Sequence, residues 1–226
     1  MQKRDFMHRV LVTGGSRGIG KAISEIFAGN SYDVYSPGRN ELDLASKASV
    51  GSFIKANPKG FDVIINNAGI NPINSIEDVK EADIDDTVMV NMIAPILLIR
   101  GFVPEMKKKK CGRIVNIGSV WNVVSKPKRS IYGSTKHGIH GLTAALALEL
   151  SDLGILVNTV SPGFTLTDMT KQNNPPAEIE KIGKQIPLGR MAEPEEIAKV
   201  VFFVGSFDNT YITGQNIVVD GGYSIQ

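Results

Sequence analysis

Short apolar runs alternate along the chain with longer stretches in which apolar residues recur at helical spacing. The short runs are rich in Val, Ile and Leu and have no polar face. Strands of this kind are buried on both faces, as in parallel sheets covered by helices on both sides. The pattern therefore predicts an α/β fold with a doubly wound parallel sheet.

The expected strands span residues 10–13, 33–36, 41–44, 61–66, 113–118, 155–161 and 216–219. The expected helices span residues 18–28, 46–56, 84–105, 131–150, 177–184 and 193–205. We expect Pro95 to bend the longest helix, because proline lacks a backbone N–H. The sequence contains no internal repeat and no low-complexity linker. We therefore expect residues 1–226 to form a single domain.

The composition narrows the classes of function. A net charge of +2 across 226 residues is too small to favour nucleic acid or an acidic membrane surface. The single cysteine, Cys111, excludes an intramolecular disulfide, and the three histidines form no metal-binding pattern. The apolar runs fall short of the roughly 18 residues needed to span a membrane. The N-terminal residues begin basic but lead into a strand instead of a signal-peptide core, so we expect a cytoplasmic protein.

A glycine-rich turn follows the first expected strand and opens the first helix. It reads Thr13-Gly14-Gly15-Ser16-Arg17-Gly18-Ile19-Gly20. Gly14 permits a tight turn, whereas Gly18 and Gly20 allow the backbone to approach a pyrophosphate. The helix N-terminus offers free N–H groups to phosphates. The turn predicts a dinucleotide site, and a structural turn without a ligand is the alternative.

A second motif lies near the middle of the chain. Tyr132 and Lys136 are one helical turn apart, so their side chains share a face. A phenol has a pKa of about 10, and a nearby ammonium group lowers it. Ser119, at the end of an expected strand, would hold a carbonyl oxygen against the phenol. The three residues predict proton transfer for an alcohol/carbonyl interconversion; an ordinary half-buried tyrosine is the alternative.

Further segments occur in an order that is typical of one family. They are Asn66-Asn67-Ala68-Gly69, Asn91 in the long helix, Pro162-Gly163 followed by Thr167, Ile212-Thr213-Gly214-Gln215 and Val219-Asp220-Gly221-Gly222. With the glycine turn and the Ser119, Tyr132 and Lys136 set, the chain resembles the short-chain dehydrogenase/reductase family over essentially its whole length. It is most similar to the 3-oxoacyl-carrier-protein reductase-like members.

The resemblance implies a Rossmann fold and a homodimer or homotetramer. It implies that Asn91, Ser119, Tyr132 and Lys136 are catalytic, with Asn91 holding a water that links Lys136 to solvent. The implied cofactor-binding residues are Thr13, Gly14, Ser16, Arg17, Gly18, Ile19, Gly20, Arg39, Asp43, Leu44, Asn67, Ala68, Gly69, Tyr132, Lys136, Pro162, Gly163, Thr165 and Thr167.

The chain departs from the family after the second expected strand, where the usual helix before the third strand is missing. NAD-binding sites usually carry an acidic residue at the end of the second strand. The chain reads Tyr35-Ser36-Pro37-Gly38-Arg39 there. Arg39 and Arg17 would bind a 2′-phosphate, with Ser16 as a hydroxyl donor. We therefore expect NADP(H) in preference to NAD(H), and solvated surface arginines are the alternative.

The sequence thus predicts an NADP-dependent oxidoreductase that interconverts a carbonyl and a secondary alcohol, with Tyr132 as acid/base. The alternatives are a sugar-nucleotide reductase or epimerase and a non-catalytic NADP-binding sensor. The substrate is expected to be a small carbonyl or alcohol compound, either acyl-thioester or sugar-linked. Lys126, Lys128 and Arg129 precede Tyr132 and are interpreted either as a solvated loop or as attraction for an acidic partner. Trp121 would line the substrate pocket or pack in the core.

Overall fold

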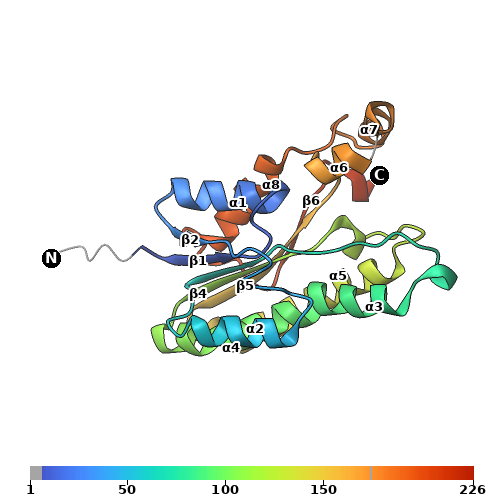
Figure 1. Cartoon of the computed structure of the whole chain (residues 1–226). Helices are drawn as coiled ribbons and strands as arrows, with labels where there is room; N and C mark the ends of the chain where they lie inside the picture. The colour runs from blue at the N-terminus through green and yellow to red at the C-terminus, as the bar shows by residue number, and fades with distance from the viewer. Residues whose placement is uncertain (1–6, 174) are drawn as a thin grey trace.

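The computed structural model describes residues 7–173 and 175–226, and a parallel sheet runs through it (Figure 1). The sheet has six strands in the order β2-β1-β3-β4-β5-β6, and every pair of neighbouring strands is parallel. The strands are β1 (Arg9–Val12), β2 (Asp33–Tyr35), β3 (Val63–Asn66), β4 (Gly112–Ile117), β5 (Ile155–Pro162) and β6 (Asn216–Val219).

Helices cover both faces of the sheet (Figure 1). They are α1 (Gly18–Gly29), α2 (Lys47–Ala56), α3 (Glu81–Val88), α4 (Ala94–Lys109), α5 (Ser130–Leu150), α6 (Asp168–Asn173), α7 (Pro176–Gly183) and α8 (Pro194–Gly205). Successive strand residues point to opposite faces. Accordingly, Leu11 packs in the core with α2, α4 and α5, whereas Val10 and Val12 pack with α1 and α8. The predicted doubly wound architecture is confirmed.

The strand order reverses beside β1, which pairs with β2 on one side and with β3 on the other. A crevice forms at such a point, outside the carboxyl ends of the strands, because the connections leave in opposite directions. The glycine turn follows β1, and the Asn67 segment follows β3. The topology therefore brings both predicted cofactor segments to one edge of the sheet.

The expected strand at residues 41–44 is wrong, because this segment is a turn. The N–H groups of Glu41 and Leu42 both donate to the carbonyl oxygen of Gly38, at 3.0 and 2.9 Å, so they are not available to a strand ladder. Leu42 is buried in the core. The connection from β2 to β3 thus holds α2 as its one α-helix, and the predicted absence of a second helix is confirmed.

The longest helix begins at Glu81, three residues before the expected Ile84, and continues through α3, the π-helical segment η2 (Met89–Ile93) and α4. Pro95 lacks an N–H, which removes a regular helical hydrogen bond next to η2. Glu81–Lys109 is long enough to cross a membrane and contains an 18-residue window with a mean hydropathy of 1.7, contrary to the sequence expectation. However, 56% of its apolar window is buried in the fold, where Leu98 and Phe102 pack in the core.

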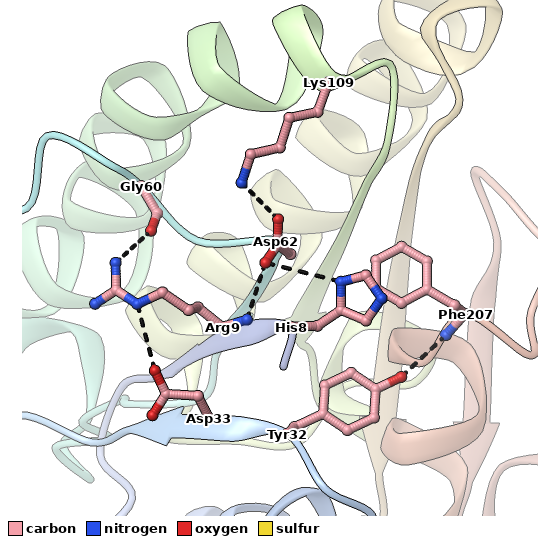
Figure 2. A network of polar contacts seen from close by, with 8 residues as sticks. All are labelled: His8, Arg9, Tyr32, Asp33, Gly60, Asp62, Lys109 and Phe207. Carbon is pink, nitrogen blue, oxygen red and sulfur yellow. Dashed lines mark hydrogen bonds and ion pairs between the residues drawn. The ribbon is translucent and has the colours of Figure 1, made fainter. Parts of the chain in front are cut away.

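A charged cluster ties together the opposite, amino-terminal end of the sheet (Figure 2). The Asp62 carboxylate accepts hydrogen bonds from the Arg9 backbone N–H (2.9 Å) and Lys109 Nζ (2.7 Å), and His8 Nδ1 lies 3.8 Å from it. The Arg9 guanidinium pairs with Asp33 over 3.5 Å. These hydrogen bonds and the Lys109 charge lower the pKa of Asp62 against the opposing effect of its burial. The cluster joins β1, β2, α4 and the start of β3.

Candidate active site

A cavity of about 640 Å³ opens at the carboxyl ends of β1 and β3. The glycine turn, the segment after β2, the loop after β3 and the start of α6 form its walls. Most of the predicted cofactor residues line it: Gly14, Ser16, Arg17, Gly18, Ile19, Gly20, Arg39, Asp43, Leu44, Asn67, Ala68, Gly69 and Thr167.

The backbone of the glycine turn explains why side chains are excluded from it. Gly14 has a φ of +67° and Gly18 a φ of +53°, a region that favours glycine. A Cβ on Gly20 would collide with the carbonyl oxygen of Gly14. The cap residue of α1, Arg17, makes no side-chain capping bond, so the first N–H groups of α1 have no side-chain cap where this helix lines the cavity. This cradle fits the pyrophosphate of a dinucleotide.

Thr13 does not line the cavity but lies buried beneath it. Its Oγ1 accepts hydrogen bonds from the backbone N–H groups of Asn67 (3.0 Å) and Ala68 (3.1 Å). Asn67 Nδ2 in turn donates to the carbonyl oxygen of Thr13 over 2.9 Å. Thr13 therefore positions the loop after β3 against the glycine turn.

The cavity wall near β2 contains an exposed ion pair. Arg39 Nε lies 3.5 Å from Asp43 Oδ1, and the Arg39 side chain is 81% exposed. The sequence argument found no carboxylate at the end of β2, yet the turn brings Asp43 beside Arg39 inside the same cavity. Sequence reasoning also missed the lining residues Pro37, Gly38, Leu42, Ala45, Ile70, Asp86, Val90 and Asp168.

The structure brings Ser119, Tyr132 and Lys136 together. Ser119 follows β4, whereas Tyr132 and Lys136 lie on α5. Hydrogen bonding with Ser119 acts on the pKa of Tyr132, and Lys136 Nζ lies 5.5 Å from the centre of the Tyr132 ring. Lys136 Nζ also donates to the carbonyl oxygen of Ile117 over 2.7 Å, which fixes the ammonium group below the phenol.

Burial dominates the pKa values at this centre. It lowers the pKa of Lys136 to about 8 and raises the pKa of Tyr132. The hydrogen bond from Ser119 and the positive charge of Arg129 act in the opposite direction on the Tyr132 pKa. The sequence argument assigned the lowering to Lys136. The charge of Arg129, one helical turn before Tyr132, acts on the phenol pKa in the same direction.

Asn91 lies on η2, and its side chain is fully engaged by protein groups. Its oxygen accepts from the N–H of Ile70, and its nitrogen donates to the carbonyl oxygen of Ile70, each over 2.9 Å. The same nitrogen also donates to Thr135 Oγ1 over 3.2 Å. A Cβ on Gly69 would lie 3.3 Å from Asn91 Oδ1 and 3.6 Å from Lys136 Nζ, so the three residues adjoin. Asn91 therefore positions the loop after β3 against α5.

The predicted residues Pro162, Gly163 and Thr165 do not line the large cavity. The N–H of Gly163 donates to the carbonyl oxygen of Val219 over 2.9 Å, and Thr165 is buried. Phe164 between them packs edge-on against Trp121 and Tyr223, with ring centres 5.8 and 5.2 Å away. Trp121 is 8% exposed, so most of its surface packs in this aromatic cluster.

A second cavity of about 280 Å³ lies between the loop after Ser119 and α5. Trp121, Lys126 and Arg129 are among its lining residues. Sequence reasoning grouped Lys126 with Arg129 but gave no reason to separate their roles. Within the described residues, no group of three or more His, Cys, Asp or Glu side chains is placed to hold a metal ion.

Comparison with known proteins identifies the family. The family model described as enoyl-(acyl carrier protein) reductase matches residues 40–224. A 3-oxoacyl-[acyl-carrier-protein] reductase FabG of Vibrio cholerae is 35% identical over 233 residues, which are 94% of this chain and 95% of the relative. The chain belongs to the short-chain dehydrogenase/reductase family. Members of this family are NAD(P)-dependent oxidoreductases, so the predicted family, fold and enzyme class are confirmed.

Other family members support this assignment. The carbonyl reductase family member 4 of Xenopus laevis is 35% identical over 234 residues, which cover 95% of this chain and 97% of the relative. The solved structure "ElxO with NADP Bound" has a TM-score of 0.90 at 30% identity and covers 98% of this chain and 100% of that chain. "4-hydroxyisoleucine dehydrogenase complexed with NADH" has a TM-score of 0.91 at 26% identity, covering 97% and 99%.

Proposed function

We propose that this short-chain dehydrogenase/reductase interconverts a carbonyl and a secondary alcohol, with NADP(H) as cofactor and Tyr132 as the acid/base. The convergence of Ser119 and Lys136 on Tyr132, beside a cavity shaped for a dinucleotide, carries the proposal. The names of the relatives support the same chemistry, since they include 3-oxoacyl-[acyl-carrier-protein] reductase and carbonyl reductase.

The three side chains divide the proton chemistry between them. The Ser119 hydroxyl donates a hydrogen bond to the substrate carbonyl oxygen and orients it towards Tyr132. Tyr132 gives its phenolic proton to that oxygen as the carbonyl becomes an alcohol, and solvent returns a proton to the phenolate. Lys136, charged below a pKa of about 8, favours this phenolate. The nicotinamide supplies the hydride when bound, so one hydride and one proton complete the reduction.

The cofactor is held by the residues that form the large cavity. The glycine turn and the free N–H groups of α1 bind the pyrophosphate. Lys136 binds the nicotinamide ribose, and Arg17 and Arg39 bind the 2′-phosphate of NADP(H). The ion pair between Arg39 and Asp43 is exposed and therefore weak, so the Arg39 side chain can turn towards a phosphate. The NADP in the ElxO structure supports this choice of cofactor.

We also propose that the protein is a cytoplasmic homodimer or homotetramer. Leu148 on α5 and Phe203 on α8 leave 87% and 50% of their surface exposed. Exposed apolar side chains of this size favour contact with another copy of the chain. Light scattering on the eluting peak of a sizing column checks the state, and a monomer at micromolar concentration contradicts it.

A panel of ketones, acyl thioesters and sugar nucleotides with NADPH and NADH side by side tests the proposed function. We expect NADPH oxidation with carbonyl substrates, and a loss of roughly 10²- to 10⁴-fold in kcat for Tyr132→Phe with NADPH binding retained. We expect Arg39→Ala to reduce the preference for NADPH over NADH by at least about tenfold. Wild-type turnover in Tyr132→Phe contradicts the mechanism. NADPH binding without turnover of any substrate supports the sensor alternative instead.

A further inference from the structure

Arg129 stands directly before the catalytic helix. It is the cap residue of α5, and its carbonyl oxygen accepts a hydrogen bond from the N–H of Gly133 over 2.7 Å. Its side chain therefore leaves the backbone one turn before Tyr132. The positive charge of Arg129 acts on the Tyr132 pKa, which places the guanidinium within electrostatic reach of the phenol.

The Arg129 guanidinium has few protein partners. One terminal nitrogen donates to Asn71 Oδ1 over 3.3 Å, and the buried Nε has no hydrogen-bond partner. Within residues 7–173 and 175–226, no Asp or Glu forms an ion pair with it. A half-buried cation without a counterion is costly, and burial lowers the pKa of Arg129.

Arg113 shows how this fold satisfies a buried arginine that serves only the structure. Its guanidinium donates to the carbonyl oxygens of Ser206 (3.2 Å), Gly112 (2.8 Å), Gly154 (3.3 Å) and Asn209 (2.7 Å). All three of its nitrogens therefore have partners. The contrast indicates that the donors of Arg129 are kept for a group outside the chain.

Asn71 joins this cation to the loop after β3. It follows Ile70, which the Asn91 side chain holds through two hydrogen bonds, and it is two residues beyond Gly69 beside Lys136. Arg129 and Asn71 thus join the loop after β3 to the helix that carries Tyr132. The same two elements carry Gly69, which adjoins Lys136, and Tyr132, so a group bound between Arg129 and Asn71 lies near the proposed catalytic residues.

Two lysines accompany Arg129 in this loop. Lys126 Nζ lies 5.7 Å from the Trp121 ring and 5.6 Å from the Phe164 ring, and Lys126 and Arg129 line the same 280 Å³ cavity. Lys128 lies between them in the sequence and is exposed. Lys126 makes cation–π contacts with these two rings, whereas Arg129 has a buried donor without a partner.

We propose that Arg129, together with the amide group of Asn71, binds a carboxylate of the substrate, so that the enzyme acts on a short oxo acid and its hydroxy acid. This inference rests on the proposed function, because it places the carboxylate a few bonds from the carbonyl that Ser119 and Tyr132 hold. A guanidinium binds a carboxylate through two parallel charge-assisted hydrogen bonds. The Asn71 NH₂ group supplies a further donor while its oxygen orients Arg129.

The test compares 3-oxobutanoate with its uncharged ethyl ester, using NADPH and the full chain. We expect the wild-type enzyme to prefer the acid, and Arg129→Gln to raise the KM for the acid about 10- to 100-fold with less than about threefold change for the ester. Because Arg129 also acts on the Tyr132 pKa, Arg129→Gln can change kcat equally for the acid and the ester. The test of the carboxylate site is therefore the difference between the two KM values. Arg129→Lys should recover part of the affinity for the acid.

Lys128→Gln is the matched control, since it removes the same charge from an exposed neighbour and should leave both KM values within about twofold. Equal losses for acid and ester in Arg129→Gln overturn the proposal in favour of a structural role. A preference for 3-oxobutanoyl-CoA that depends on Arg129 also overturns it, because the bound anion is then a phosphate.

A binding measurement separates this proposal from the proposed function. If no substrate is turned over, the thermal shift produced by 3-oxobutanoate in the presence of NADPH still reports the carboxylate site. A shift that Arg129→Gln abolishes and Lys128→Gln retains supports the site even though catalysis fails. The absence of a shift in wild-type protein up to about 10 mM of the acid overturns it.

Discussion

The side chain of Asn91 bonds both backbone groups of Ile70, accepting from its N–H and donating to its carbonyl oxygen, each over 2.9 Å. The π-helical turn of η2 places this buried amide between the loop after β3 and α5. A single polar side chain thereby sets the distance between the loop that lines the large cavity and the helix that carries Tyr132.

Replacing Asn91 by alanine should therefore weaken both the fold and the site. Asn91→Ala leaves the Ile70 backbone groups without these partners, and we expect it to lower the free energy of unfolding by about 2–3 kcal/mol. We expect kcat to fall about tenfold or more. Urea denaturation and steady-state kinetics measure the two effects. Asn57→Ala, which removes a hydrogen bond to Phe53 at the end of α2, is a control that should leave kcat unchanged.

The buried ammonium group of Lys136 should make stability depend on pH. Its pKa is about 8 in the folded chain and about 10.4 when unfolded. Between these values the unfolded chain holds a proton that the folded chain has released, so this group's contribution to the free energy of unfolding rises with pH. From pH 7 to about 10 the difference between wild type and Lys136→Met should grow by about 2–3 kcal/mol in favour of wild type. A pH-independent difference in urea denaturation contradicts the buried charge.

Two glycines of α1 should respond in opposite ways to alanine. A Cβ on Gly20 would collide with the Gly14 carbonyl oxygen, whereas nothing lies within 4 Å of a Cβ on Gly29. We expect Gly20→Ala to distort the turn and weaken NADPH binding at least about tenfold. Gly29→Ala should bind NADPH normally and gain up to about 1 kcal/mol of stability. Fluorescence titration with NADPH and thermal melts distinguish them, and normal binding by Gly20→Ala contradicts the predicted cradle.

The Asp62 cluster should be sensitive to acid. Its hydrogen bonds and the Lys109 charge lower the Asp62 pKa, so its stabilisation is present above the unfolded pKa of about 3.9 and is lost as the pH falls through the folded value. Asp62→Asn should cost about 1–3 kcal/mol at pH 7. The cost should shrink below about pH 4 in urea denaturation. Asp33→Asn, at an exposed pair with Arg9, is the control and should cost under about 1 kcal/mol.

The sequence predicted the sheet because short, uninterrupted apolar runs are typical of parallel strands that are buried on both faces. It failed at residues 41–44, where the Gly38 carbonyl oxygen takes the N–H groups of Glu41 and Leu42 in a local turn. It also began the long helix late, since Glu81 and Asp83 belong to a polar first turn that adds nothing to apolar periodicity.

The candidate site was predictable where neighbours in sequence are neighbours in space, as in the glycine turn and in Tyr132 with Lys136. It was not predictable where folding joins distant segments. Arg129 and Asn71 are 58 positions apart, and neither carries a motif. Their contact exists because the loop after β3 and the start of α5 meet at one end of the sheet.

In the proposed cofactor site, the turn between β2 and α2 separates cofactor choice from folding. Arg39 and Asp43 lie in a segment that does not pair with any strand of the sheet. Leu42 holds this segment in the core. Exchanging the exposed pair therefore changes the charge presented to the adenosine end of a dinucleotide without unpairing a strand. We therefore expect a few substitutions in this turn to change the preference between phosphorylated and unphosphorylated nicotinamide cofactors.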